Sequence, residues 1–292
     1  MKILVTGGSG FIGRNLVEQF AGEFEVFAPT HGELELLDTD AVDSFFREHE
    51  INVVVHSATR PGHRKACDTS GIVEWNTRMF LNLARNTSRY DKMILITSGA
   101  VYDSSNSLPK MKEDYFDTHM PKEDSGYSKY ICAKYSDLLG KVIELRPFGV
   151  FGRYEEWQIR FISNMICKAL HDLPLTMKQN RLFDYIYIDD LVKVVRYFIT
   201  HIPQYKAYNV TPDAAVELKQ LAAMVLDECG KDLDIVVASP EMAREYSGDN
   251  TRLKQEIRDL SITDLREAIH LLWTWYSERI DCIDRQKLLF DL

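Results

Sequence analysis

The first twenty residues constrain the fold more than any other stretch of this chain. They read as an apolar strand over residues 3–5, a glycine-rich turn over residues 6–13, and a helix with apolar side chains at helical spacing. Gly7, Gly10 and Gly13 lie three residues apart, which suits a sharp turn, a close approach of pyrophosphate to the backbone, and tight packing of helix on strand. The phosphate oxygens would then meet free N–H groups at the positive end of the helix. A turn that binds nothing is the alternative for three glycines alone, but the strand before them and the helix after them favour a nucleotide site.

The loop TGGSGFIG at residues 6–13 resembles the TGxxGxxG loop of the extended short-chain dehydrogenase/reductase family, the NAD(P)-dependent epimerases, dehydratases and reductases of nucleotide sugars. Further matches run to about residue 215. The resemblance implies an α/β fold with a doubly wound parallel sheet of Rossmann type. It implies a dinucleotide-binding domain over 1–152, completed by about 181–210, and a substrate-binding region over 153–180 and 211–292. Within the loop, the cofactor-binding residues that it implies are Gly7, Gly10, Phe11, Ile12, Gly13 and Arg14.

Composition excludes several classes of partner. A hydrophobic content of 45% in 292 residues is enough for a proper core. A net charge of -9 argues against a nucleic-acid partner, which needs a basic surface. The five cysteines show no CxxC or Cys/His spacing, so we expect reduced thiols, no metal site and a cytoplasmic protein. The chain opens directly into a strand and has no apolar run of membrane-spanning length, so we expect no membrane partner.

The end of the second expected strand, residues 25–28, bears on the choice of cofactor. An acidic residue there would bind both hydroxyls of the adenosine ribose, and none is present. Thr30 and His31, together with Arg14, could accommodate a 2'-phosphate, which favours NADP with NAD as the alternative. Ordinary loop residues are an equally simple interpretation.

Two further positions take cofactor roles from the resemblance. Asp38 ends a short motif, residues 34–38, that in the family sets a carboxylate against the adenine amino group. It could instead cap the helix that follows, since apolar residues at helical spacing begin three positions later. Ala58 lies in the small-residue turn 56–59, which in the family runs along the cofactor.

Candidate substrate contacts are basic residues in two loops. Arg60, His63, Arg64 and Lys65 cluster in an otherwise acidic chain and could meet substrate phosphates, although solvated surface charge explains them equally well. Residues 181–190 resemble the family's RDYVxVxD strand, whose arginine contacts the substrate diphosphate. The aligned position here is Phe183, but Arg181 lies on the same strand face and is the candidate substitute.

The expected catalytic residues lie in two places. One follows the strand at 92–97, and the others lie on a later helix. Ser98 matches the family serine that hydrogen-bonds the reacting oxygen of the substrate. In the segment GYSK, Lys129 matches the lysine that lowers the pKa of a tyrosine and holds the nicotinamide ribose. The tyrosine position itself, four residues before Lys129, is occupied by Ser125. A serine hydroxyl is shorter and far harder to ionise than a phenol, so it cannot simply replace the missing acid.

Three explanations of this serine stay open. Tyr130 and Lys134 repeat the spacing one turn later, but about 140° around the helix from Ser125, where a packing role is the better interpretation. The chain could be an inactivated enzyme, or the proton could come from another loop. The sequence therefore predicts an NAD(P)-dependent epimerase or reductase of a nucleotide-diphosphate sugar, with a non-catalytic NAD(P)-binding sensor or scaffold as the alternative. The resemblance also implies a homodimer formed through the helices that carry Trp75 and Lys129.

Overall fold

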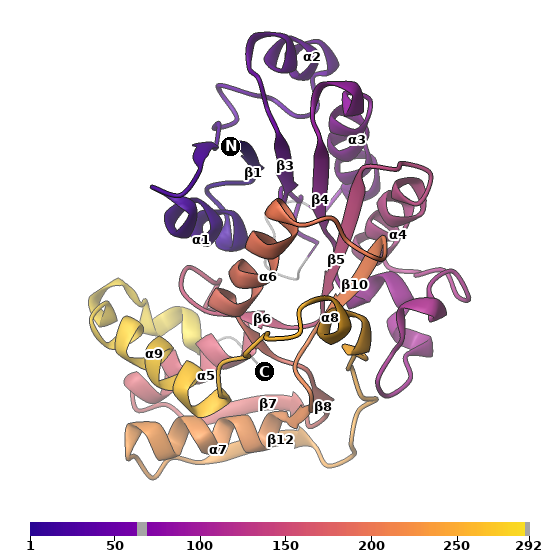
Figure 1. Ribbon diagram of the computed structural model, residues 1–292. Coiled ribbons are helices and arrows are strands. Elements are labelled where there is room, and N and C mark those ends of the chain that lie inside the picture. The colour runs from indigo at the N-terminus through magenta and orange to yellow at the C-terminus, as the bar shows by residue number, and fades with distance from the viewer. Residues whose placement is uncertain (63–68, 290–292) are drawn as a thin grey trace.

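A parallel sheet of six strands forms the centre of the computed structural model, which describes residues 1–62 and 69–289 (Figure 1). Its strand order is β10-β5-β4-β3-β1-β2. The strands are β1 (Lys2–Thr6), β2 (Glu25–Phe27), β3 (Val53–His56), β4 (Lys92–Ile96), β5 (Val142–Pro147) and β10 (Ala207–Val210). Their apolar, often β-branched runs suit strands that are covered on both faces. The order in which successive strands are added to the sheet reverses between β1 and β3. Open α/β sheets bind their ligands at such a point.

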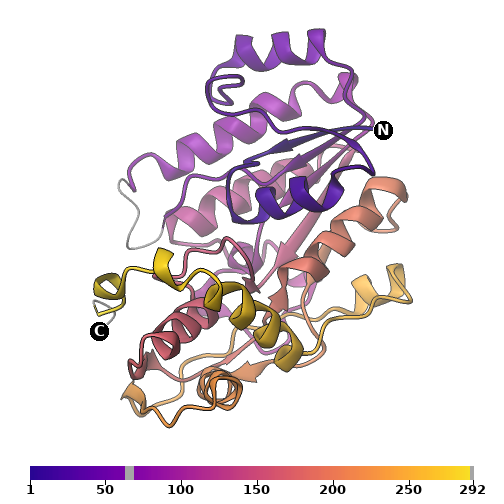
Figure 2. The ribbon, with the colours of Figure 1, turned by 90° about the vertical axis from the view of Figure 1, so that its left-hand side faces the viewer.

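Helices cover both faces of this sheet, which confirms the predicted doubly wound fold. Ile3 and Val5 pack in the core with α1 (Phe11–Phe20) and α6 (Ile188–Thr200), whereas Leu4 belongs to the core on the opposite face. That opposite face carries α2 (Thr39–Glu48), α3 (Ile72–Ala84) and α4 (Asp124–Ser136), and Figure 2 shows the two layers. Among the helices of residues 1–62 and 69–289, none is both long and apolar enough to cross a membrane.

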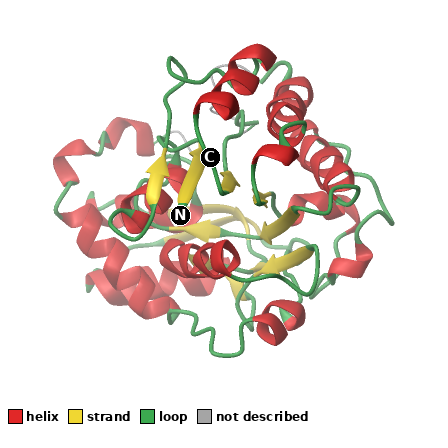
Figure 3. Ribbon diagram, turned by 45° about the horizontal axis from the view of Figure 1, so that its top comes forward, coloured by secondary structure: helices red, strands yellow, loops and turns green. Residues whose placement is uncertain are grey.

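The remaining elements gather beside the carboxyl ends of the sheet strands (Figures 1 and 2). Three two-stranded sheets lie there, pairing β6 (Val150–Phe151) with β9 (Ile186–Tyr187), β7 (Leu175–Gln179) with β12 (Ile235–Ser239), and β8 (Leu182–Phe183) with β11 (Val216–Glu217). The helices of this region are α5 (Phe161–Leu170), α7 (Leu218–Cys229), α8 (Thr251–Glu256) and α9 (Leu265–Ser277). Figure 3 shows strands inside and helices around them.

Short 3-10 helices occupy several connections between these elements. The one that matters for the site is η2 (Gly99–Tyr102), which turns the chain directly after β4. The others are η1 (Thr87–Arg89), η3 (Ser104–Asn106), η4 (Glu113–Tyr115), η5 (Ile280–Cys282) and η6 (Arg285–Leu288).

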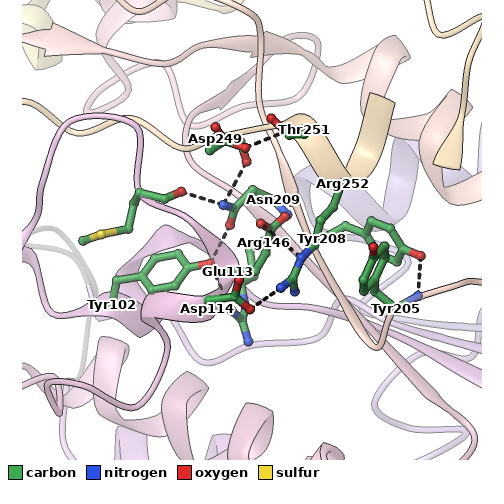
Figure 4. A network of polar contacts seen from close by, with 11 residues as sticks. Tyr102, Glu113, Asp114, Arg146, Tyr205, Tyr208, Asn209, Asp249, Thr251 and Arg252 are labelled. Atoms are coloured by element: carbon green, nitrogen blue, oxygen red, sulfur yellow. Dashed lines mark hydrogen bonds and ion pairs between the residues drawn. The ribbon is translucent and has the colours of Figure 1, made fainter. Parts of the chain in front are cut away.

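A buried polar network joins the sheet to the carboxy-terminal region (Figure 4). Arg146 and Glu144 on β5 form an ion pair with Nη2 and Oε2 at 2.5 Å, and both side chains are almost fully buried. Arg146 also donates to the Tyr102 hydroxyl at 3.0 Å, which in turn donates to Oδ1 of Asn209 on β10 at 2.6 Å. The Asn209 amide donates onward to the carbonyl of Asp249, one residue before the segment that leads into α8. The network therefore joins η2, which follows β4, and the approach to α8 to the edge of the sheet.

Candidate active site

The glycine loop lies where β1 meets α1, and its geometry leaves no room for side chains. Gly7 has φ +71°, and a Cβ at this residue would lie 2.8 Å from the backbone of Ala58. A Cβ at Gly13 would lie 2.1 Å from the Gly7 carbonyl oxygen. Gly10 begins α1 without a side-chain cap, so the first N–H groups of the helix have no side-chain acceptor there. Such a helix end is suited to phosphate oxygens.

Two cavities flank this loop and share Ala58. The smaller, about 50 Å³, lies between the loop and the segment after β2; its lining includes Gly7, Thr30 and His31. The larger, about 220 Å³, lies at the ends of β3, β4 and β5; its lining includes Phe11, Ile12, Ser98 and Lys129. A dinucleotide laid across the loop would place its adenosine half in the first cavity and its nicotinamide half in the second. The crowded glycines and the uncapped helix fit the pyrophosphate between them.

The adenosine-side cavity has no acidic residue among those of the described chain that line it. Thr30 lies in this lining and donates from its N–H and its hydroxyl to the carboxylate of Glu33, at 2.8 and 2.9 Å. These two hydrogen bonds hold the pKa of Glu33 below its usual value. Arg14 turns away from this cavity: it pairs with Glu18 at 3.1 Å and stacks on the Tyr154 ring at 3.7 Å.

Asp38 directly precedes α2 and caps it. Its carboxylate accepts hydrogen bonds from the backbone N–H groups of Asp40 and Ala41, at 2.9 and 3.1 Å. This is the second of the two roles that the sequence left open. A contact of Asp38 with adenine stays a prediction.

The nicotinamide-side cavity brings Ser98 and Lys129 together, although 31 residues separate them in the chain. The Lys129 ammonium on α4 donates to the Ser98 hydroxyl oxygen at 3.2 Å, and the backbone N–H of Ala100 donates to the same oxygen at 3.3 Å. Burial, with a smaller contribution from the nearby positive charge of Arg160, lowers the pKa of Lys129 to about 8.

Arg160 was not among the residues that the sequence indicated for the site. Apolar residues fall at helical spacing over residues 154–170, but α5 begins at Phe161 and Arg160 is the residue that precedes it. Tyr154 has φ +72°, a left-handed backbone that a helix cannot accommodate. Arg160 therefore lies at the end of an irregular loop, where it lines the same cavity as Lys129.

Ser125 lies on the first turn of α4 but is not part of the lining of this cavity. A Cβ on Gly62 would be 3.3 Å from the Ser125 Cβ, so the loop after β3 lies against this side chain. One turn later, Ser128 accepts from the Asn76 amide at 3.3 Å and donates to the Ser125 carbonyl at 3.0 Å. These contacts hold the start of α4 against α3.

Two other tyrosines, Tyr130 and Tyr246, carry the phenol that position 125 lacks. The Tyr130 hydroxyl and the Lys134 ammonium both bind the carboxylate of Asp117, and neither lines the nicotinamide-side cavity. Tyr246 comes from the segment before α8, and a Cβ built on Gly99 would lie 2.7 Å from its hydroxyl oxygen. The matches to the family run only to about residue 215, so Tyr246 was not among the residues that the sequence indicated.

A third cavity of about 460 Å³ lies between α5, β7 and β8. Arg181 lines it, as does Lys178, and the rings of Phe183 and Tyr185 stack in its wall with centroids 4.8 Å apart. Phe161 lines this cavity while its neighbour Arg160 lines the nicotinamide-side cavity, so each cavity has one wall residue at the start of α5. The arrangement offers cations for phosphates and an aromatic wall for a base.

The other basic loop, which begins at Arg60, is described only in part. Arg60 places its guanidinium on the Trp75 ring at 3.6 Å, and its backbone N–H donates to the Asn76 side chain at 2.7 Å. His63, Arg64 and Lys65 lie outside the described residues. Their suggested role toward substrate phosphates stays a prediction.

Comparison with known proteins identifies the family. The model of the NAD dependent epimerase/dehydratase family matches residues 3–211, which is most of the chain. The chain belongs to this family. The resemblance to extended short-chain dehydrogenases/reductases is thereby confirmed, and with it the expectation of an NAD(P)-dependent enzyme family.

Relatives with curated names act on nucleotide sugars. A GDP-L-fucose synthase from Azorhizobium caulinodans is 31% identical over a region that covers 44% of this chain and 42% of that protein. A dTDP-4-dehydro-6-deoxy-D-allose reductase from a Streptomyces species is 24% identical over 94% of this chain and 95% of the relative.

Solved structures share the fold at low sequence identity. UDP-glucose 4-epimerase from Thermotoga maritima superposes with a TM-score of 0.82 at 18% identity, covering 96% of this chain and all of that one. A GDP-mannoheptose C4 reductase from Campylobacter jejuni with NADP bound gives a TM-score of 0.80 at 20% identity, with coverage of 94% and 98%.

Proposed function

We propose that this protein is an NADP-dependent reductase or epimerase of a nucleotide-diphosphate sugar, with NAD as the alternative cofactor. The observation that carries the proposal is that two cavities lie on either side of the start of α5, one lined by Arg160 and the other by Phe161. One contains Ser98 and Lys129, and the other contains Arg181 and an aromatic wall. A sugar between them would face the redox ring while its diphosphate and base occupy the second cavity.

The cofactor-binding residues proposed here are those of the loop and its two flanking cavities. Gly7, Gly10 and Gly13 would receive the pyrophosphate, and Lys129 would hold the nicotinamide ribose. When bound, the cofactor supplies or accepts a hydride. Among the described residues that line the adenosine-side cavity there is no carboxylate, since Glu33 binds Thr30 from outside the lining; this supports NADP, because an acidic group in the lining would repel a 2'-phosphate.

The first experiment measures cofactor affinity and then turnover. Calorimetry with NADPH and NADH should show tighter binding of NADPH, and equal or weaker binding of NADPH would reverse the cofactor assignment. A panel of nucleotide-diphosphate keto sugars should then produce NADPH oxidation with at least one member. Arg181→Gln should raise KM for that sugar and leave the NADPH affinity unchanged, since Arg181 lies in the second cavity.

A specific observation also supports the alternative of a non-catalytic binding protein, namely the serine at position 125. Ser125→Tyr separates the two. A large gain in turnover indicates a disabled enzyme, whereas no gain together with an inactive parent indicates a binder. Tyr130→Phe is the companion variant and should change nothing, because the Tyr130 hydroxyl is engaged by Asp117 outside the cavity.

We further propose a homodimer in the cytoplasm, formed through the outer faces of α3 and α4. These neighbouring helices and the turn after α4 expose large apolar side chains: Trp75, Leu81, Tyr135 and Leu138. Sedimentation velocity of the protein, compared with a Leu81→Glu/Tyr135→Glu variant, tests the assembly. A parent that sediments as a monomer would exclude it.

A further inference from the structure

We propose that Lys129, acting through the Ser98 hydroxyl, is the proton donor and acceptor of this site, and that Arg160 is a positioning residue that keeps the Lys129 amine ready to release its proton. The inference rests on the proposed function, because it assigns the acid for that reaction. It answers the question left by Ser125, which offers no phenol to the cavity.

The hydrogen bonds around Ser98 determine the direction in which its hydroxyl donates. A serine oxygen has two lone pairs and a single proton to donate. The Lys129 ammonium and the Ala100 N–H both donate to this oxygen, at 3.2 and 3.3 Å. With both lone pairs engaged, the hydroxyl proton is left to donate to a third group, and Ser98 lines the open cavity. A substrate oxygen placed there would receive that proton.

Lys129 is the group in contact with Ser98 that can replace the proton. Its Nζ lies at hydrogen-bond distance from the Ser98 oxygen, the contact that a relay requires. Ser125 does not line the cavity, and the Tyr130 hydroxyl is bound to Asp117 elsewhere. The hydrogen bond thus connects a titratable amine directly to the hydroxyl that faces the substrate.

Arg160 supplies the charge that makes this amine easier to deprotonate. It lines the same cavity from the start of α5, and like charges favour the neutral form of the lysine. The other titratable groups in the lining are neutral. His56 is buried, shares a hydrogen bond with Thr6, and has a pKa lowered to about 4 by burial. The pKa of the Cys132 thiol is raised to about 12, mainly by burial.

The proton transfers balance as follows in the reductive direction. The reduced nicotinamide is the two-electron reductant that supplies the hydride to the carbonyl carbon of the sugar. The carbonyl oxygen takes up the electron pair of its broken π bond and accepts the proton of the Ser98 hydroxyl. Ser98 regains a proton from the Lys129 ammonium, and the neutral Lys129 amine is protonated again from water. Oxidation of a sugar alcohol follows the same steps in reverse.

The decisive experiment titrates Lys129 by NMR in protein labelled at the lysine ε-carbon, without cofactor. The Lys129 signal, assigned by its loss in Lys129→Arg, should titrate near pH 8 and should move upward by about one pH unit in Arg160→Gln. Arg153→Gln is the matched control, because Arg153 pairs with Asp189 at 3.4 Å and does not line the cavity. An unchanged Lys129 titration in Arg160→Gln overturns the role of Arg160.

Kinetics then tests the relay. Lys129→Arg keeps a cation for the ribose but cannot release a proton, so kcat should fall by about 100-fold or more while the NADPH affinity changes little. In Arg160→Gln the midpoint of the kcat–pH profile should move with the NMR titration. Retained turnover in Lys129→Arg, with loss of turnover in Tyr246→Phe, would transfer the acid role to Tyr246. If no dinucleotide binds and no sugar reacts, the proposed function fails, whereas the NMR titration still tests the coupling of Arg160 to Lys129.

Discussion

Removing the Arg146 guanidinium should destabilise the protein strongly, because it leaves a carboxylate buried without its cation. Arg146 and Glu144 are 2% and 1% exposed in their side chains, and their ion pair closes at 2.5 Å. In Arg146→Met the stem of the side chain is kept, but among the described residues Glu144 retains only the Thr97 hydroxyl, at 2.6 Å, as a side-chain donor. Breaking a buried pair in this way costs about 3–5 kcal/mol of the free energy of unfolding.

The same loss can be expressed as a melting temperature. Unfolding entropies of about 2.1 cal/mol/K per residue amount to roughly 0.6 kcal/mol/K for a chain of this length. A cost of about 3–5 kcal/mol therefore lowers Tm by about 5–8 °C. Differential scanning calorimetry measures the shift, and urea unfolding gives the change in free energy independently.

A matched control and a double variant make this prediction sharp. Arg266 forms a pair with Asp227 at 3.1 Å in which both side chains are more than 60% exposed, so Arg266→Met should cost less than about 1 kcal/mol. Glu144→Gln/Arg146→Met removes the orphaned charge and should recover part of the stability lost in Arg146→Met. Equal costs for Arg146→Met and Arg266→Met, or a double variant as unstable as the sum of its parts, would refute the reasoning.

Three further substitutions probe the loop, a helix cap and a buried acid. Gly13→Ala should abolish NADPH binding in calorimetry, because its Cβ would lie 2.1 Å from the Gly7 carbonyl oxygen; full affinity would contradict the assigned loop. Asp38→Ala should lower the free energy of unfolding by about 1 kcal/mol through loss of the cap, with unchanged NADPH affinity, whereas a large loss of affinity would instead indicate adenine contact. Glu155 is buried, and burial raises its pKa from 4.5 to about 7, so the folded protein holds a proton that the unfolded chain releases. Stability should therefore fall as pH rises from 4.5 to 7, and Glu155→Gln should flatten that fall in urea titrations.

The sequence was informative where the fold is local. The glycine loop, the buried strands and the helices of the doubly wound sheet follow from patterns within about thirty residues of one another, and the structure confirms that sheet. Ser98 and Lys129 were singled out by family motifs, and the structure brings them to 3.2 Å. The carboxyl ends of the strands in a parallel sheet lie along one edge. The position of Ser98 after β4 therefore follows from the strand pattern, whereas Lys129 comes from α4.

The sequence was uninformative where a side chain reaches the site from an irregular segment. Arg160 and Tyr246 both come from loops outside the central sheet, and their positions depend on how the chain reverses around α5 and before α8. The left-handed backbone at Tyr154, which delays α5, leaves no mark in the hydrophobic periodicity. Long-range polar contacts such as Tyr102 with Asn209, 107 residues apart, are equally invisible to local patterns.

Residues on the sheet and its glycine loop and residues from irregular segments have different roles in the proposed site. The sheet and its glycine loop supply a cofactor groove whose geometry is fixed by backbone, so the groove tolerates no added Cβ at Gly7 or Gly13. In the proposed mechanism the chemistry beside that groove also depends on Arg160, which lines the same cavity as Lys129 from the start of α5. Under this proposal, a serine in place of the family tyrosine on α4 should change which group supplies the proton more than whether the cofactor binds. Apart from Lys129, which has both roles in the proposal, affinity for NADPH and the rate of proton transfer should respond to separate sets of substitutions, and a glycine-loop variant that alters only the rate, or an Arg160 variant that alters only the affinity, would show that this division is wrong.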